Sequence, residues 1–191
     1  MTKDQILEAA AQIFRTKGFH AASMQDIAEA VNLQKASLYH HVSSKQEILL
    51  DLLDRALDVL TQQVAAEVNS NGSADIRLRK AVYAYLNTII ENRDLASVLL
   101  LEHRSLEATL QARHIPRRDR FERLWRGLIE EGKREGTFHC DDPALATRAI
   151  LGTLNWTITW YRPEGELSVD ELAENYVNFF LFGLFGTIPN V

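Results

Sequence analysis

Residues 23–49 read SMQDIAEAVNLQKASLYHHVSSKQEIL, and the fold can be inferred outward from them. Apolar side chains recur at helical spacing twice within this stretch, first around Ile27 and then around Leu38 in a segment at about 34–41. Asn32 lies between the two segments, where its side chain tolerates the left-handed backbone of a tight turn. Two short helices joined by such a turn predict a helix-turn-helix motif, whose second helix enters the major groove of DNA.

Signals for helix starts and ends lie on either side of this motif. Ser23 and Asp26 resemble a capping box in which Asp takes the place of the usual Glu, and residues 44–47 contain a full Ser-x-x-Glu box. The second box starts a long helix with a leucine-rich stripe. Upstream, apolar residues at helical spacing predict a helix over residues 5–17, which Gly18 ends.

The remainder of the chain is also predicted to be helical. A polar linker covers residues 69–73, and no stretch shows the alternation that is typical of a β-strand. We place the later helices at Leu78–Ile89, Leu95 to about Glu107, about Pro116 to Glu135, Asp142 to Tyr161, and Ser168 onward. The predicted fold class is therefore all-α, with about nine helices.

Composition limits the function. The chain has 191 residues, with 21 Lys and Arg against 26 Asp and Glu, which gives a formal net charge of −5. An acidic chain does not bind nucleic acid indiscriminately, so any DNA contact must be local. The single cysteine fits a reducing cytosol, and the longest apolar run, 179–185, is too short to span a bilayer. We expect a cytoplasmic protein with no membrane partner and no signal peptide.

The second helix of the motif offers polar side chains to DNA. Gln34, Lys35 and Ser37 can donate hydrogen bonds to base edges or phosphates, and the two residues after Leu38 can donate to backbone oxygens. Alone, a surface lysine is more often solvated and a tyrosine more often packs, so placement in the motif is what favours DNA. The predicted DNA-binding residues are Ser23, Gln25, Gln34, Lys35, Ser37, Tyr39, His40 and Lys45.

The same region resembles the signature of the TetR family of bacterial repressors. Residues 33–49 are similar to a pattern that reads Val-Ser-Lys-Gly-Thr-Leu-Tyr-His-Tyr-Phe-x-Ser-Lys-Glu-x-Leu, and residues 9–19 and 26–28 fit the family upstream. The positions that depart from the pattern are Gln34, Ala36, His41 and Val42. The resemblance implies a ligand-responsive transcriptional regulator, most often a repressor, that binds an operator in double-stranded DNA.

Composition and resemblance both predict a homodimer. The two C-terminal helices, around residues 144–158 and 176–185, are apolar around most of their circumference, and such helices must be covered on all sides. Pairing across a two-fold axis would bury their outer faces in a four-helix bundle. The predicted interface residues are Ile150, Leu154, Tyr176 and Phe180. The alternative is that these faces are only intrachain core. A two-fold dimer would read a near-palindromic operator with half-sites about 34 Å apart.

The resemblance also implies a small-molecule cavity among the central helices. The residues that we nominate as its lining are Tyr85, Leu99, His103, Arg117, Arg120, Trp125, Leu128, Trp156 and Trp160. They would give an apolar pocket with a few polar handles, although the apolar ones also suit ordinary core. We therefore expect a helix-turn-helix DNA-binding domain over residues 1–48 and a helical ligand-binding and dimerisation domain over residues 49–191.

Two arginines indicate the kind of ligand. Arg117 precedes Phe121 by four residues and Arg120 precedes Leu124 by four, so both continue an inward-facing stripe. Guanidinium groups at the mouth of an apolar cavity suit a ligand with an apolar end and a phosphate or carboxylate end, such as an acyl-CoA thioester. Residues 155–168 also resemble the C-terminal region of TetR-like regulators of fatty-acid, steroid or aromatic acid breakdown. A solvated basic face is the alternative.

Signals for other functions are weak. No Glu-x-x-His pair, zinc pair, phosphate-binding glycine loop or nucleophile elbow occurs, so we predict no enzyme, no cofactor and no metal site. Residues 139–142 could chelate a metal by chance, but Asp142 is expected to cap a helix. The remaining alternative is a constitutive, architectural helix-turn-helix DNA-binding protein without a small-molecule effector.

Overall fold

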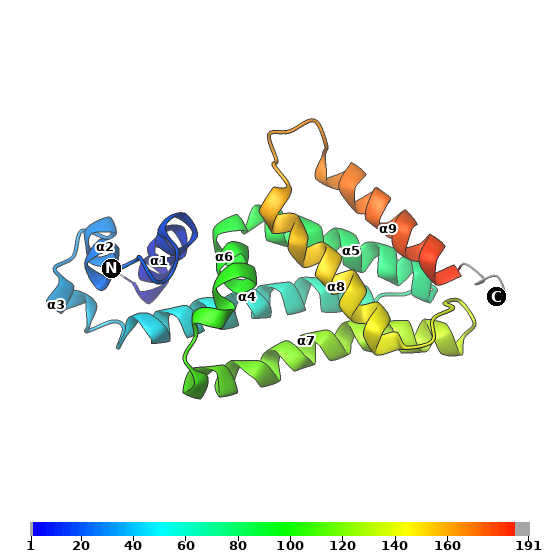
Figure 1. Ribbon diagram of the computed structural model, residues 1–191, viewed down its shortest axis with the longest axis horizontal. Coiled ribbons are helices and arrows are strands. Elements are labelled where there is room, and N and C mark those ends of the chain that lie inside the picture. The colour runs from blue at the N-terminus through cyan, green and yellow to red at the C-terminus, as the bar shows by residue number, and fades with distance from the viewer. Residues whose placement is uncertain (1, 186–191) are drawn as a thin grey trace. The chain divides into compact units, whose positions relative to one another are not determined.

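The computed structural model describes the backbone of residues 2–185 and side chains through residue 182, and every regular element in this part of the chain is a helix (Figure 1). The α-helices are α1 (Lys3–Lys17), α2 (Met24–Ala30), α3 (Lys35–Leu38), α4 (Lys45–Val68), α5 (Ala74–Glu91), α6 (Arg93–Ser97), α7 (Ala108–Arg134), α8 (Pro143–Trp160) and α9 (Val169–Phe185). A π-helix, Val98–Glu102, and a 3₁₀-helix, His103–Ser105, lie between α6 and α7. The predicted all-α class with about nine helices is confirmed.

The helices form two compact units. Unit 1 comprises Met1–Asp58 and Asn92–Arg118, and unit 2 comprises Val59–Glu91 and Asp119–Val191. The segment after α5 joins unit 1 because α6 packs against α1. Contacts between such distant segments leave no local signal in the sequence. The functional division into residues 1–48 and 49–191 therefore stays a prediction that does not coincide with these units.

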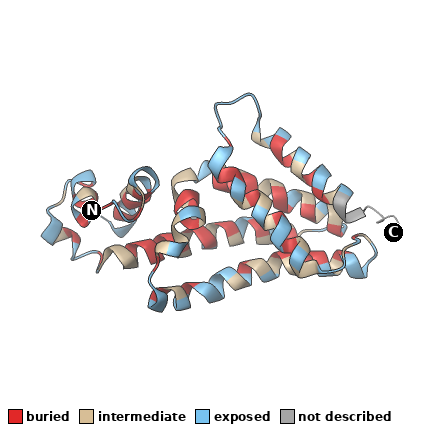
Figure 2. Ribbon diagram, viewed as in Figure 1, coloured by how far each residue is buried: buried red, intermediate tan, exposed pale blue. Residues whose placement is uncertain are grey.

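The helix-turn-helix segment of unit 1 is built on an apolar core. Phe14 of α1, Ile27 of α2 and Leu38 of α3 are fully buried (Figure 2). The ring of Phe14 also meets the ring of Phe19 edge-on, with 5.2 Å between the centroids. Each large side chain buried in this way stabilises the folded state by roughly 1.5 to 3 kcal/mol. This core fixes the three short helices against one another.

The capping box and turn predicted for the motif are both present. Ser23 Oγ accepts the N–H of Asp26 at 3.1 Å, and the Asp26 carboxylate accepts the N–H of Ser23 at 2.8 Å. Lys17 Nζ lies 2.7 Å from the same carboxylate, and this hydrogen bond, followed by those from Ser23, lowers the pKa of Asp26 to about 2. Asn32 has a φ of 54°, which is the left-handed conformation expected in the turn.

The segment predicted as one helix from Leu95 to Glu107 is broken in the structure. α6 ends at Ser97, and a π-helical and a 3₁₀ segment follow it. Irregular turns of this kind are frequent at functional sites. α7 begins at Ala108 rather than near Pro116, and it continues through the proline. The apolar spacing that marked this helix begins only at Phe121, so it gave no signal for the turns before Pro116.

Unit 2 is organised around α5, which packs against α8 and α9. Its buried Tyr85 meets the buried Trp125 of α7 edge-on, with 6.1 Å between ring centroids. α8 and α9 begin as predicted, since Asp142 caps α8 ahead of Pro143 and Ser168 accepts a hydrogen bond from the first turn of α9. None of the described helices combines the length and apolarity that crossing a membrane requires.

Candidate nucleic-acid interface

The helix-turn-helix motif consists of α2, the turn at Asn32 and α3. α3 is one turn long, Lys35–Leu38, and so it is shorter than the predicted segment 34–41. His40 and His41 then continue the chain in hydrogen-bonded turns. Because Leu38 is fully buried beneath α3, the neighbouring side chains are held on the outer side of the motif.

Five of the predicted DNA-binding residues lie together on this outer side. Tyr39 is 47% exposed and Ser37 is half-buried, while the other three side chains are exposed. Lys35 makes no ion pair within the described part of the chain, so its ammonium group is available to a phosphate. We call these residues the reading surface: Gln34, Lys35, Ser37, Tyr39 and His40. Their contact with DNA stays a prediction.

The two predicted contacts at the start of α2 are not equally available. The Ser23 hydroxyl donates to the Asp26 carboxylate at 2.7 Å and accepts from the Asp26 N–H, so it is committed to the helix cap. Gln25 is exposed, and its amide donates to Glu29 at 2.8 Å on the same helix. Gln25 can exchange a surface hydrogen bond for a DNA contact, whereas Ser23 would have to break the cap.

Lys45, which we predicted to contact a phosphate, is bound to the protein backbone instead. Its Nζ donates to the carbonyl oxygens of Phe19 at 2.8 Å, Ala22 at 2.7 Å and His20 at 3.5 Å. It also lies 4.5 Å from the centroid of the Phe19 ring, as in a cation–π contact. The three donors of the ammonium group are thereby committed to the loop between α1 and α2. Lys45 is therefore a brace for that loop.

A second polar cluster in unit 1 was missed by the sequence analysis. The Glu102 carboxylate accepts from the Phe19 N–H at 3.2 Å and from Ser105 Oγ at 3.1 Å. The Gln46 side chain donates to the Ser105 carbonyl at 3.0 Å and accepts from the Glu107 N–H at 3.0 Å. We call these five residues the relay cluster. No sequence pattern marks it, because its members come from segments far apart in the chain.

Two predicted effector residues lie in unit 1. Leu99 is buried and His103 is half-buried. Burial lowers the pKa of His103, and the positive charges of Arg104 and Arg118 lower it further, so the neutral form of its imidazole is favoured.

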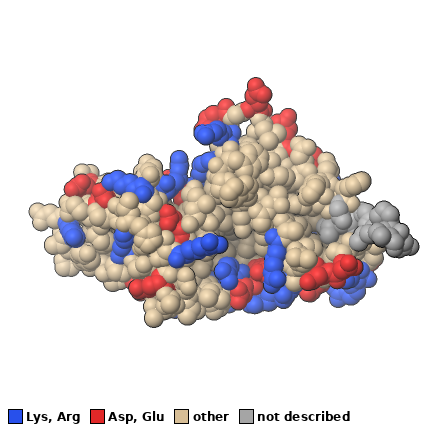
Figure 3. Space-filling model, viewed as in Figure 1, with Lys and Arg blue, Asp and Glu red and all other residues tan. Residues whose placement is uncertain are grey.

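The two predicted anion-binding arginines differ in their surroundings. Arg117 lies 3.3 Å from Asp54 and 2.7 Å from Asp58, so its charge is balanced by α4 within unit 1. Arg120 belongs to unit 2 and is exposed. Helical spacing placed both on one stripe, but it could not show which acidic partners face that stripe. On the face drawn in Figure 3, basic side chains are likewise interspersed with acidic ones.

The predicted effector residues of unit 2 divide into buried and exposed groups. Tyr85, Trp125 and Leu128 are fully buried, and the first two are in ring contact. Trp156 is 66% exposed and Trp160 is 43% exposed, so neither lines an enclosed cavity in the single chain. The structure therefore brings together the residues of α5 and α7 and leaves the two tryptophans of α8 on the surface.

The four predicted dimer-interface residues are mostly packed within their own chain. Ile150, Leu154 and Phe180 are buried there. Tyr176 is half-buried, and its hydroxyl accepts a hydrogen bond from Thr157 at 3.2 Å. Their contact with a second copy stays a prediction, because α8 and α9 are apolar on most sides and the sequence does not show which side faces the intrachain core.

The apolar side chains that α8 and α9 leave exposed lie on the opposite side of these helices. Phe179 is 71% exposed and Phe182 is 82% exposed, which is unusual for residues of this size. We call these residues the outer apolar face: Leu145, Trp156, Phe179 and Phe182. A second copy of the chain is the natural cover for it, since two-fold pairing places identical apolar faces together.

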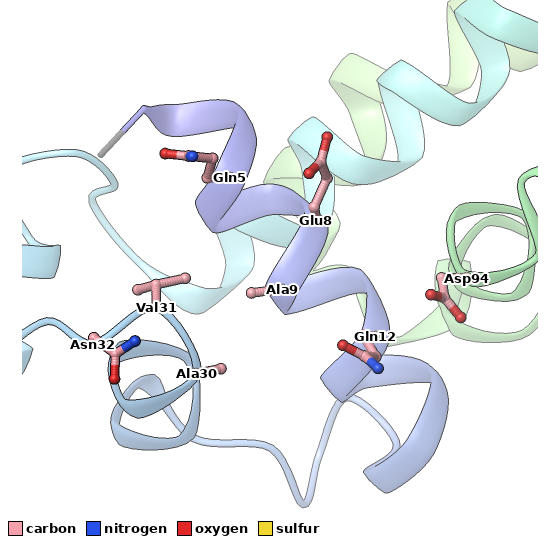
Figure 4. A pocket seen from close by; sticks show the side chains of 8 residues that line it. All are labelled: Gln5, Glu8, Ala9, Gln12, Ala30, Val31, Asn32 and Asp94. Atoms are coloured by element: carbon pink, nitrogen blue, oxygen red, sulfur yellow. The ribbon is translucent and has the colours of Figure 1, made fainter.

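A separate polar hollow of about 510 Å³ lies on unit 1 (Figure 4). Its lining consists of Gln5, Glu8, Ala9, Gln12, Ala30, Val31, Asn32 and Asp94. Asp94 is paired with Arg15, and Glu8 lies 3.9 Å from Arg55, so the acidic groups of the hollow already have partners. No three His, Cys, Asp or Glu side chains meet in the described residues as a metal ion would require.

Comparison with known proteins identifies relatives over most of the chain. Residues 6–52 match the family described as bacterial regulatory proteins, tetR family, and residues 71–184 match the tetracyclin repressor-like C-terminal domain. The transcriptional repressor KstR2 of Rhodococcus jostii is 30% identical over 184 residues, which cover 95% of this chain and 90% of the relative.

Solved structures show the same fold. PfmR, a TetR family regulator of Thermus thermophilus, has a TM-score of 0.85 and 37% identity, with 92% of this chain and 96% of that chain covered. AibR, solved in complex with isovaleryl coenzyme A and operator DNA, has a TM-score of 0.87 and 25% identity, with 93% and 96% covered.

The fold and the reading surface thus define a DNA-binding transcriptional regulator of the helix-turn-helix class. The two family matches extend over the motif and over the helices that follow it. The chain belongs to the TetR family of bacterial transcriptional regulators.

Lys45→Met tests whether Lys45 is a brace. We expect the free energy of unfolding to fall by about 1 to 3 kcal/mol, because the substitution leaves the carbonyls of Phe19 and Ala22 without their charged donor. Operator affinity should also fall, because the motif loosens, but the slope of log affinity against log salt should not change. Denaturant unfolding and salt-dependent fluorescence anisotropy measure the two quantities.

Lys35→Ala is the matched control for this experiment. Its ammonium group is exposed, so stability should change little, whereas the salt slope should fall by about 0.9 for one lost phosphate contact. A reduced salt slope in Lys45→Met would show that Lys45 neutralises a phosphate and would contradict the brace.

Phe179→Glu tests the outer apolar face. In a two-fold dimer each new carboxylate would be buried near its own copy, and unpaired buried charges of like sign strongly oppose association. We expect the variant to sediment as a folded monomer. Leu101→Glu, at an apolar residue of unit 1 that is 54% exposed, should leave the dimer intact. A Phe179→Glu protein that remains fully dimeric would place the interface elsewhere.

Proposed function

We propose that this protein is a homodimeric repressor that binds a near-palindromic operator and releases it when a CoA thioester binds. It acts in the cytoplasm, beside the DNA that it regulates, and it has no enzymatic activity of its own. One observation carries the ligand-responsive part of the proposal. The loop that positions the reading surface is hydrogen-bonded to the irregular segment after α6, through the relay cluster.

The relay cluster gives a ligand a physical route to the motif. The Glu102 carboxylate accepts a hydrogen bond from the N–H of Phe19, and the carbonyl of Phe19 accepts one from Lys45. Gln46 binds the backbone on both sides of Leu106, so a shift of this segment would break its two hydrogen bonds together. Each such bond contributes about 0.5 to 1.5 kcal/mol. That magnitude matches the roughly 1 to 3 kcal/mol that is typical of allosteric coupling.

One observation supports a CoA thioester as the effector. AibR, which has the same fold, was solved with isovaleryl coenzyme A and operator DNA. The charge of Arg117 is already balanced by Asp54 and Asp58, so this arginine is not proposed as a phosphate contact.

The proposal is tested by measuring operator release. Genome-wide footprinting first supplies the operator, and fluorescence anisotropy then gives its affinity with and without isovaleryl-CoA, octanoyl-CoA and longer thioesters. At least one thioester should weaken operator binding about 5- to 150-fold, and the operator should weaken binding of that thioester by the same factor. Free coenzyme A and the matching free acids are the controls. An operator affinity that no thioester changes would favour the constitutive DNA-binding protein instead.

Gln46→Ala tests the relay cluster. Loss of the amide removes both hydrogen bonds to residues 105–107. The ratio of operator affinity without thioester to operator affinity with thioester should therefore fall by about threefold or more. Ser43→Ala, at an exposed position two residues before Lys45, is the control and should keep the full ratio. An unchanged ratio in Gln46→Ala would exclude this cluster from the coupling.

A further inference from the structure

One polar group in the core of unit 2 is left without a partner. The Trp125 side chain is 1% exposed, and its indole N–H is buried without a hydrogen bond to any described residue. Its aromatic neighbours are Tyr85 and Phe121, at 6.1 and 6.4 Å between ring centroids and nearly perpendicular to it. Aromatic faces are weak acceptors compared with a carbonyl oxygen. The core therefore holds a strong donor whose capacity is unused.

The same tyrosine also contacts a second residue that carries N–H donors. Burial raises the pKa of Tyr85 above its usual range, so its hydroxyl stays protonated, and that proton is donated to Asn155 Oδ1. This bond orients the Asn155 side chain and leaves its amide N–H₂ group unused by the tyrosine. Tyr85 thus contacts Trp125 of α7 through its ring and Asn155 of α8 through its hydroxyl.

These groups select a particular ligand chemistry. The rings of Tyr85, Phe121 and Trp125 contact one another and make these surroundings apolar, and the N–H groups of Trp125 and Asn155 are neutral. A carboxylate would have to give up its hydration without gaining a cation, which is unfavourable. A carbonyl oxygen carries little charge and accepts hydrogen bonds well, so a ketone, ester or thioester on an apolar body satisfies the donors at a smaller desolvation cost.

We propose that the indole N–H of Trp125 donates a hydrogen bond to the thioester carbonyl oxygen of the effector, with Asn155 as the neighbouring donor. This inference rests on the proposed function, because it names the atom by which the effector is recognised. It makes Trp125 a specificity-determining residue: the site distinguishes an acyl thioester from the corresponding free acid and from a thioether that lacks the carbonyl group.

The test pairs one substitution with one change in the ligand. Trp125→Phe keeps an aromatic ring but removes the donor, and Tyr83→Phe likewise removes a donor from an aromatic ring, here a hydroxyl of α5 that donates to Glu174 at 3.0 Å. The probes are isovaleryl-CoA and octanoyl-CoA, each with its thioether analogue in which a methylene replaces the carbonyl. The measured quantity is the concentration that releases half of the bound operator.

Trp125→Phe should raise the half-release concentration of the thioesters about 3- to 10-fold and change that of the thioethers by about twofold or less. Tyr83→Phe should behave as the wild type does with both kinds of ligand. An equal effect of Trp125→Phe on thioesters and thioethers would mean that the substitution disturbs packing alone, and it would overturn the inference. A half-release concentration of the thioesters that is unchanged in Trp125→Phe would also overturn the inference.

Nitrogen-15 NMR of the indole groups supplies a readout that packing alone would not move. The chain has 3 tryptophans, so the Trp125 signal is assigned from its loss in Trp125→Phe. Its N–H proton should shift downfield with a thioester and much less with the thioether. A wild type whose operator binding responds to no thioester would remove both the proposed effector and this inference. A responding wild type with an unmoved Trp125 signal would overturn the inference alone.

Discussion

The position of the reading surface depends on the ammonium group of Lys45, which is hydrogen-bonded within the protein. Lys45 stands in the first turn of α4, and its ammonium group binds the carbonyls of Phe19 and Ala22 in the loop between α1 and α2. Backbone carbonyls in such a loop have no helical partner, so they need a donor. Since α2 starts at the end of this loop, the same contact sets where α2 and then α3 lie. α4, the helix that follows the motif in the chain, thus fixes the loop that precedes the motif.

The segment after α6 uses polar contacts at the point where it meets this loop. Ser105 and Glu102 form hydrogen bonds with side chains and backbone there. Apolar packing over a broad area resists small displacements, whereas a few hydrogen bonds can be exchanged with water at modest net cost. The π-helical turn before Glu102 adds irregular backbone at the same place. A regulator that must change state needs a junction of this kind rather than a second rigid core.

The parts of the molecule that sequence analysis could predict are those with local causes. Asn32 in the turn and the caps at Ser23, Asp142 and Ser168 follow from side-chain chemistry within a few residues, and the structure has all of them. The orientation of α8 does not have a local cause, because Leu154 and Trp156 are both apolar and only tertiary packing buries one and exposes the other. The partners of Lys45, Gln46 and Arg117 are likewise distant in the chain. The Tyr85 and Trp125 pair could be nominated by residue type, but its unpaired N–H could not.

The internal use of cations also explains how an acidic protein can read DNA selectively. In unit 1 the charged groups of Lys3, Arg15 and Lys17 are paired with acidic side chains, and Lys45 is bound to carbonyls. Non-specific affinity for DNA comes almost entirely from cations that displace counterions from phosphates. With few such cations available, we expect binding to rely on hydrogen bonds from the reading surface and on two copies engaging a symmetric site at once. The affinity that comes from binding both half-sites at once is lost when the distance between the two motifs changes, since each motif alone binds weakly. A modest coupling to an effector is then sufficient to release the operator.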